Sequence, residues 1–172
     1  MSNLNELFSE SKEFKIFGSY KTQNSSLGYK GEIKLLSDGR VIGLVSDSLG
    51  YRRLNLILGL SDEDNLYFLR FRKTQNKTNS VPFFFNFKKN GSDLSFIGKY
   101  DPYLDLNFST EIAKIRNYNR KLSEIYTDLA TLVSKEVLES YIFKNGIREK
   151  VIESGRDANL NLVLNGDKKW MS

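Results

Sequence analysis

Tight-turn dipeptides divide the N-terminal part of this chain into short segments of alternating polarity. The clearest alternation runs from Arg52 to Leu60, where every second residue from Leu54 onward is leucine. A period of two is that of a β-strand, whose successive side chains point to opposite faces. Asp38-Gly39 and Asn90-Gly91 are strong hairpin signals, because both central residues of a type I′ turn need positive φ. Since no helical pattern separates the segments, the strands must pair antiparallel.

The remaining segments follow the same pattern. We expect strands over 29–37, 40–47, 52–60, 66–73, 83–88 and 94–100, and a short one at 104–108. Many short strands at regular spacing are typical of a small barrel or sandwich. We therefore expect a mainly β fold, a closed or nearly closed antiparallel barrel. The phenylalanines at 83, 84, 85 and 87 put bulk on both faces of one strand, so one face should fill the barrel and the other should meet a helix.

A long amphipathic helix is expected after the strands. Ser109 or Thr110 can cap its start, Asn145-Gly146 is a good stop, and one apolar stripe connects Ile115 to Leu132 at helical spacing. An unbroken helix of this length would measure about 55 Å, against about 30 Å for a small domain. It must therefore bend near Ser134, project from the body, or pack on a second copy of the chain. We expect a homodimer through this helix.

The domain organisation follows from these elements. We expect residues 1–108 to form the barrel, with a short N-terminal helix or arm at 3–12. Residues 109–172 should form the C-terminal helix and a tail packed on the same domain, with one further strand at 159–164.

Two patterns of residues resemble a known group of barrels. Gly18-Ser19-Tyr20, followed by Asp38-Gly39, Gly43 and Gly59, resembles the opening of the avidins, and residues 96–100 (FIGKY) are similar to a later avidin strand. The order of barrel strands, helix and late strand resembles the lipocalins. Together these are calycin barrels, and the resemblance implies a calycin-like β-barrel with a long C-terminal α-helix. Tyr20 stands where both families prefer Trp, so the resemblance implies neither biotin nor a particular lipocalin ligand.

The amino-acid composition excludes several kinds of catalytic and metal-binding site. The 172 residues include no cysteine and no histidine, which removes disulfides, thiolate nucleophiles, the commonest metal ligand and the commonest general base. We therefore expect no enzyme activity, no catalytic residues, no cofactor and no metal. Two segments contain neighbouring carboxylates, Asp101-Pro102-Tyr103-Leu104-Asp105 and 62–65 (DEDN). Both are more typical of turns than of catalytic or metal-binding sites. The N-terminus shows no secretory signal and no apolar run reaches membrane-spanning length, so we expect a cytoplasmic protein.

One cluster of basic and aromatic residues gives a candidate site. The predicted ligand-binding residues are Tyr51, Arg53, Tyr67, Arg70 and Arg72. Arginine forks match phosphate oxygens and aromatic faces stack on bases, and the net charge of +5 agrees with an anionic partner. Arg70 continues the apolar row of Leu66 and Phe68, as expected at a barrel mouth. The alternative is that these arginines pair with Asp47 and the carboxylates of 62–64.

We therefore expect a binding module for a small anionic ligand, such as a nucleotide or signalling nucleotide. One alternative is a protein–protein interaction module, an inhibitor or assembly subunit acting through the barrel exterior or the helix. A barrel for a lipophilic ligand is a third. No segment concentrates charge as an arm for long nucleic acid would.

Overall fold

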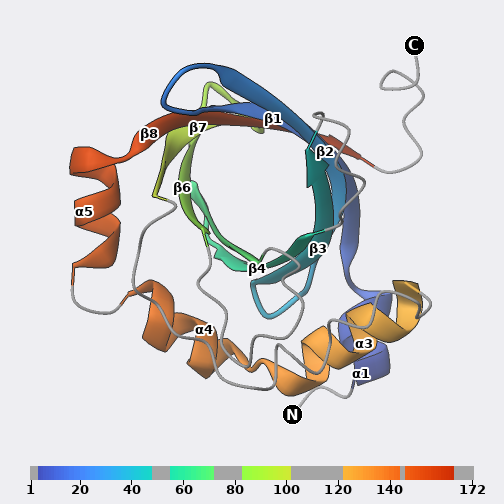
Figure 1. The fold of residues 1–172 in the computed structure, drawn as a ribbon. Helices are drawn as coiled ribbons and strands as arrows, with labels where there is room; N and C mark the ends of the chain where they lie inside the picture. The colour runs from blue at the N-terminus through green and yellow to red at the C-terminus, as the bar shows by residue number, and fades with distance from the viewer. Residues whose placement is uncertain (1–3, 48–54, 72–82, 102–121, 144–145, 165–172) are drawn as a thin grey trace, which may run out of the picture.

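Eight antiparallel strands close into a barrel in which β8 pairs with both β7 and β1 (Figure 1). The computed structural model describes residues 4–47, 55–71, 83–101, 122–143 and 146–164. The strands are β1 (Lys12–Lys21), β2 (Ser26–Leu35), β3 (Arg40–Asp47), β4 (Asn55–Ser61), β5 (Asn65–Phe71), β6 (Phe83–Asn90), β7 (Ser92–Asp101) and β8 (Arg156–Leu164). The helices are α1 (Leu4–Ser9), α3 (Leu122–Leu132), α4 (Lys135–Ile142) and α5 (Ile147–Ser154).

The mainly β fold and the two glycine turns are confirmed. Gly39 and Gly91 have φ angles of 94° and 82°, in the region that favours glycine. The Gly39 amide donates to the Leu36 carbonyl at 3.0 Å, so Ser37 and Asp38, not Asp38 and Gly39, are the central residues of the first turn. The barrel includes β8, so it extends beyond residue 108. No strand was expected at β1, because Phe17 interrupts the alternation with an apolar side chain that is 44% exposed on the outer face. The strand predicted at 104–108 lies outside the described residues.

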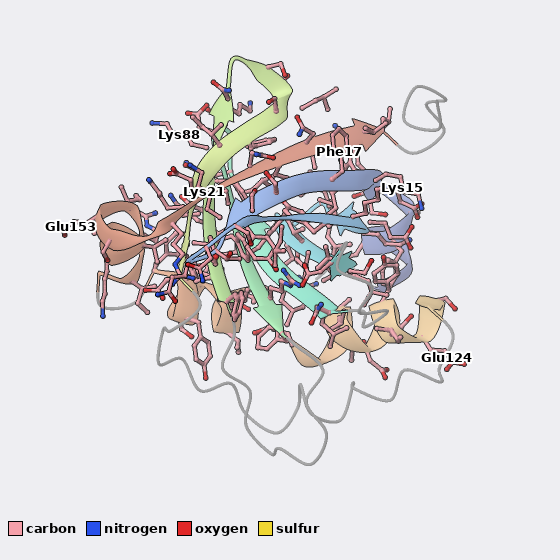
Figure 2. The ribbon with its side chains drawn as sticks, turned by 45° about the horizontal axis from the view of Figure 1, so that its top comes forward. Lys15, Phe17, Lys21, Lys88, Glu124 and Glu153 are labelled. Carbon is pink, nitrogen blue, oxygen red and sulfur yellow. The ribbon has the colours of Figure 1, made fainter. Side chains whose placement is uncertain are left out.

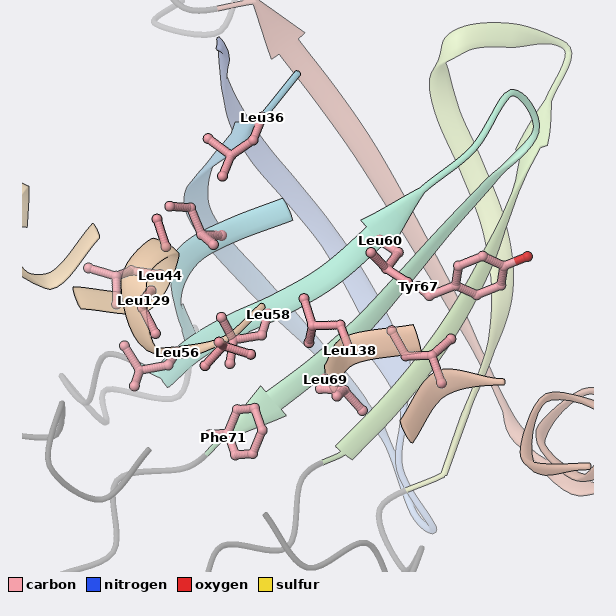
Figure 3. Close-up of a cluster of buried hydrophobic side chains, with 14 of the residues drawn as sticks. Leu36, Leu44, Leu56, Leu58, Leu60, Tyr67, Leu69, Phe71, Leu129 and Leu138 are labelled. Carbon is pink, nitrogen blue, oxygen red and sulfur yellow. The ribbon is translucent and has the colours of Figure 1, made fainter. Parts of the chain in front are cut away.

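The barrel wall separates two apolar clusters. The inner cluster fills the lumen and includes Phe85, Phe87 and Leu160. The outer cluster, shown in Figure 3, packs Leu56, Leu58 and Leu69 of the wall against Leu129 of α3 and Leu138 of α4, and it includes Phe84. The expectation that the phenylalanine cluster serves both sides of its strand is therefore confirmed. Burying both faces of β4 explains why its residues 55–60 are all buried.

The prediction of one long C-terminal helix is wrong. The stripe ends at Leu132, the last residue of α3, and α4 begins after Ser134, which caps it by accepting a hydrogen bond from the Val137 amide at 3.2 Å. The break thus falls at Ser134, where one of the three alternatives above places a bend. A short α5, which was not expected, then begins after Gly146. The break lets the helices follow the curved wall, as Figure 1 shows, where a straight rod would leave it. None of the helices in the described ranges has the length and apolarity needed to cross a membrane.

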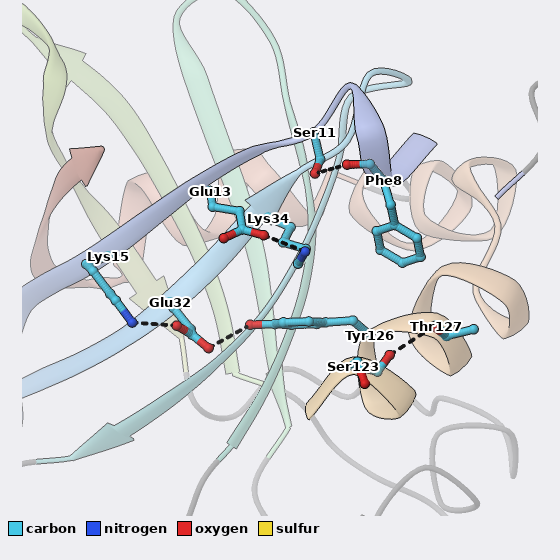
Figure 4. Close-up of polar contacts among 9 residues, drawn as sticks. All are labelled: Phe8, Ser11, Glu13, Lys15, Glu32, Lys34, Ser123, Tyr126 and Thr127. Atoms are coloured by element: carbon cyan, nitrogen blue, oxygen red, sulfur yellow. Dashed lines mark hydrogen bonds and ion pairs between the residues drawn. The ribbon is translucent and has the colours of Figure 1, made fainter. Parts of the chain in front are cut away.

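Polar contacts fasten α3 to the outer faces of β1 and β2 (Figure 4). Lys15 and Lys34 each form an ion pair at 2.6 Å, with Glu32 and Glu13 respectively. The Tyr126 hydroxyl of α3 donates to Glu32 Oε1 at 3.4 Å. Burial, with the Glu32 carboxylate as the next contribution, raises the pKa of Tyr126 well above its ordinary value, so the hydroxyl stays protonated as a donor.

Arg40 joins the opposite end of α3 to the barrel. Its side chain is buried, its Nε lies 2.8 Å from Asp38 Oδ2, and its Nη1 donates to the carbonyls of Ala130 and Val133 at 2.7 and 2.9 Å. Ala130 belongs to the last turn of α3 and Val133 directly follows the helix, so the guanidinium lies at the C-terminal end, where a cation interacts favourably with the helix dipole. One guanidinium thus holds a hairpin turn and a helix end together.

Replacing Arg40 by methionine should lower the free energy of unfolding by about 2 kcal/mol, since hydrogen bonds to a buried charge contribute about 1.5–3 kcal/mol. Urea unfolding measures this, and hydrogen exchange should show faster opening of α3. Arg40→Lys is the matched control, because it keeps the charge but cannot hold Asp38 and both carbonyls at once. Its free energy of unfolding should lie between those of wild type and Arg40→Met. An Arg40→Met protein as stable as wild type would contradict the assignment.

Candidate functional site

The predicted site residues do not form one face. Arg70 points into the lumen, where its guanidinium carbon lies 5.5 Å from the centre of the Tyr20 ring. Tyr67 lies on the other side of the wall, in the outer cluster, beside Arg148 and Phe143. An odd separation along a strand places two residues on opposite faces, so Arg70 and Tyr67 cannot act on one surface. The other predicted residues, Tyr51, Arg53 and Arg72, lie outside the described part of the chain.

Arg70 forms a buried ion pair with Asp47. Its Nη2 lies 2.8 Å from Asp47 Oδ2, and the two side chains are 3% and 16% exposed. Within the described part of the chain, the buried Nε of Arg70, Oδ1 of Asp47 and hydroxyl of Tyr20 have no hydrogen-bond partner. Pairing with Asp47 was one alternative for the arginines, but it takes place inside the barrel rather than on its surface.

Tyrosines surround this pair at the same end of the lumen. The Tyr20 ring lies 6.2 Å from that of Tyr29 and 5.2 Å from that of Tyr100, centre to centre. Burial raises the pKa of Tyr20, and the nearby Arg70 charge partly offsets this. The Tyr29 hydroxyl donates to the carbonyl of Asn159 at 2.6 Å, and burial raises its pKa far above the ordinary value. The hydroxyls of Tyr20 and Tyr29 are therefore neutral at physiological pH.

Charge and space both argue against an anion in the lumen. Asp47 already neutralises Arg70, so an added anion would leave one buried charge without a counter-ion, which is costly. The gap beside Arg70, Tyr29 and Phe85 has a volume of about 10 Å³, roughly the room of one water molecule. The described lumen is a packed core with a polar end.

A larger hollow lies on the outside of the barrel. It has a volume of about 650 Å³ and runs over the outer faces of β6, β7 and β8, between Ile152 of α5 and the β1–β2 hairpin at Lys21 and Ser26. We call it the lysine groove, because Lys21, Lys88, Lys89 and Lys99 line it. Figure 2 shows Lys21 and Lys88 on the wall that faces away from Glu124 of α3. Pockets for small ligands have volumes of about 300–1,000 Å³.

The lysine groove carries a positive charge. Asp157 is the one carboxylate among the described residues that line it, and it is shared by Lys99, which hydrogen-bonds it, and Lys21, whose Nζ lies 3.9 Å away. The hydrogen bond from Lys99 lowers the pKa of Asp157, so it remains ionised. Lys89 pairs with Asp93 at 3.0 Å. Among the described residues Lys88 has no ion-pair partner, and it is exposed.

Sequence reasoning missed the lysine groove because its residues are far apart in the chain. Lys21, Lys88 and Lys99 lie on β1, β6 and β7, and β8 joins the first of these strands to the last. The only signal was the alternation itself: these lysines occupy outward positions of their strands. That signal does not separate a site from an ordinary solvated face.

Two further observations bear on what the site could bind, namely the metal-ligating residues and the comparison with known proteins. No group of three or more His, Cys, Asp or Glu side chains that could hold a metal ion occurs in the ranges described above. No protein-family model, no curated protein and no solved structure matches this chain.

Proposed function

We propose that this protein is a binding module whose lysine groove holds a small phosphate-bearing ligand of about nucleotide size. The observation that carries the proposal is that four lysines and a single carboxylate are the charged side chains among the described residues lining a hollow of about 650 Å³. An ammonium group binds phosphate as a point charge. The negative charge of such a ligand is balanced by the excess positive charge of the groove. The described lumen has no such excess, because Asp47 neutralises Arg70.

The choice of binding over catalysis rests on the residues available. The chain has no histidine or cysteine, and the described lining of the groove offers one carboxylate, Asp157, already engaged by two lysines. The closed antiparallel barrel also supports a calycin-type binding barrel, by analogy of fold alone. It differs from a lumen-binding calycin in that the space beside Arg70 holds about one water. We therefore place the ligand on the outer wall.

Replacing both Lys21 and Lys99 by glutamine should weaken binding of adenosine triphosphate at least tenfold. Each exposed charge about 4 Å from a phosphate contributes about 1 kcal/mol in water, and 1.4 kcal/mol is a factor of ten. Calorimetry measures the affinity, and wild-type affinity should fall as salt rises because the site is exposed. Lys135→Gln, an exposed lysine on α4, is the matched control and should bind as wild type. Undiminished binding by the double variant would contradict the site.

Asp157→Asn should have the opposite effect and strengthen binding several-fold at pH 7. The substitution removes the carboxylate that repels phosphate and releases Lys21 and Lys99 from their shared partner. The lowered pKa of Asp157 means that the wild-type carboxylate is charged at this pH, so the variant differs from wild type by one full charge. Equal or weaker binding by Asp157→Asn would show that the phosphate lies elsewhere.

A further inference from the structure

The outer wall beyond the lysine groove continues in ordered rows. Antiparallel pairing aligns one row across Lys21, Asp157 and Lys99, and the next across Ser19, Asn159, Ile97 and Lys88. A third row contains Lys30, Phe17 and Asn161. Successive rows are two residues apart along the strands, or about 7 Å. The cationic side chains are therefore spread over three rows instead of converging on one point.

Phe17 is the unusual member of this face. It is 44% exposed in the middle of β1, with Lys30 opposite it on β2 and Asn161 opposite it on β8. Ile97, in the next row, is 52% exposed. Figure 2 shows Phe17 on the same side of the barrel as Lys21 and Lys88. An exposed aromatic ring beside cations and amide side chains offers a flat surface on which a base can stack.

We infer that the outer face of β1, β7 and β8 binds a short single strand of nucleic acid, which runs from the lysine groove over Phe17. This inference rests on the proposed phosphate site and extends it to a ligand with repeated charges. A single phosphate would use one row, whereas a strand places successive phosphates near successive rows and a base on Phe17. An acidic peptide offers similar charge, but it has no base to stack on the ring.

The test compares one nucleotide with a strand of twelve. Fluorescence anisotropy with labelled oligo-dT12 should give an affinity at least tenfold tighter than that of thymidine monophosphate. The logarithm of the affinity should fall with the logarithm of salt concentration with a slope of about −2 to −3, since each neutralised phosphate of a single strand contributes about −0.7.

The decisive variant is Phe17→Ala. It should weaken oligo-dT12 at least fivefold, leave the salt slope unchanged and leave thymidine monophosphate binding unchanged, because it removes stacking and no charge. Phe143→Ala is the matched control, an aromatic residue 48% exposed at the end of α4, and it should bind oligo-dT12 as wild type. Urea unfolding of both variants checks that the barrel remains folded.

The outcomes separate the two proposals. If the mononucleotide binds through Lys21 and Lys99 but oligo-dT12 binds no tighter, the strand inference is overturned and the phosphate site stands. If neither ligand binds, both proposals fail. If a poly-glutamate peptide binds as tightly as oligo-dT12 and Phe17→Ala changes neither, the face recognises acidic protein and the strand inference is overturned.

Discussion

Replacing Arg70 by methionine should lower the free energy of unfolding by about 3–5 kcal/mol, because it leaves Asp47 as an unpaired charge at the end of the lumen. The pair is held at 2.8 Å with Arg70 3% exposed, so bulk water does not replace the lost partner. Asp47→Leu alone should also destabilise the barrel, through the unpaired guanidinium. Urea unfolding followed by circular dichroism measures both losses.

The double variant Arg70→Met with Asp47→Leu is the informative comparison. Exchanging both charges for apolar side chains of similar volume is often neutral or stabilising, so the double variant should lie within about 1 kcal/mol of wild type. Its phosphate binding should equal that of wild type, since the lysine groove lies on the outer face. If the double variant lost as much free energy of unfolding as the two single variants together, Arg70 and Asp47 would not stabilise one another. Lost phosphate binding in a stable double variant would place the ligand in the lumen after all.

Replacing Gly59 by alanine should cost about 3 kcal/mol or more, the upper range for forcing atoms into a filled site. A Cβ atom at Gly59 would lie 1.8 Å from the backbone oxygen of Tyr67 on the neighbouring strand. The Tyr67 carbonyl oxygen is part of the backbone and cannot move aside by a change of rotamer, so β4 and β5 would have to separate. The close approach reflects the strong coiling that closes a small barrel, in which glycine marks tight bends.

Gly91→Ala is the matched control for this variant. A Cβ atom at Gly91 meets no described atom within 4 Å, and the opposition to the substitution comes from the φ of 82°. The left-handed region costs a residue with a Cβ about 1–2 kcal/mol. Thermal unfolding of the two variants should therefore rank Gly59→Ala well below Gly91→Ala. The reverse order would mean that the β4–β5 contact is looser than the structure indicates.

Local patterns predicted the barrel because each depends on neighbouring residues only. Asp38-Gly39 and Asn90-Gly91 form turns in any surroundings that permit positive φ, and the leucines of 54–60 alternate whatever covers them. The helix failed as a prediction for the complementary reason. The apolar stripe ends at Leu132 and a bend near Ser134 was one alternative, but the sequence could not choose between a bent and a straight helix, because that choice depends on the curved wall that α3 and α4 follow.

Three properties could be read from the amino-acid sequence alone: the chain forms short antiparallel strands, it contains no histidine or cysteine, and Arg70 shares a strand face with Phe68. Which strand face lines the lumen could be seen from the folded barrel and not from the alternation. Closure by β8 turned the face of Arg70 inward, where Asp47 neutralises it. The same closure brought Lys21, Lys88 and Lys99 together on the outer wall. Alternation along one strand determines which of its residues share a face. Which faces of different strands lie next to one another depends on pairing between strands distant in sequence, and this pairing depends on packing throughout the barrel.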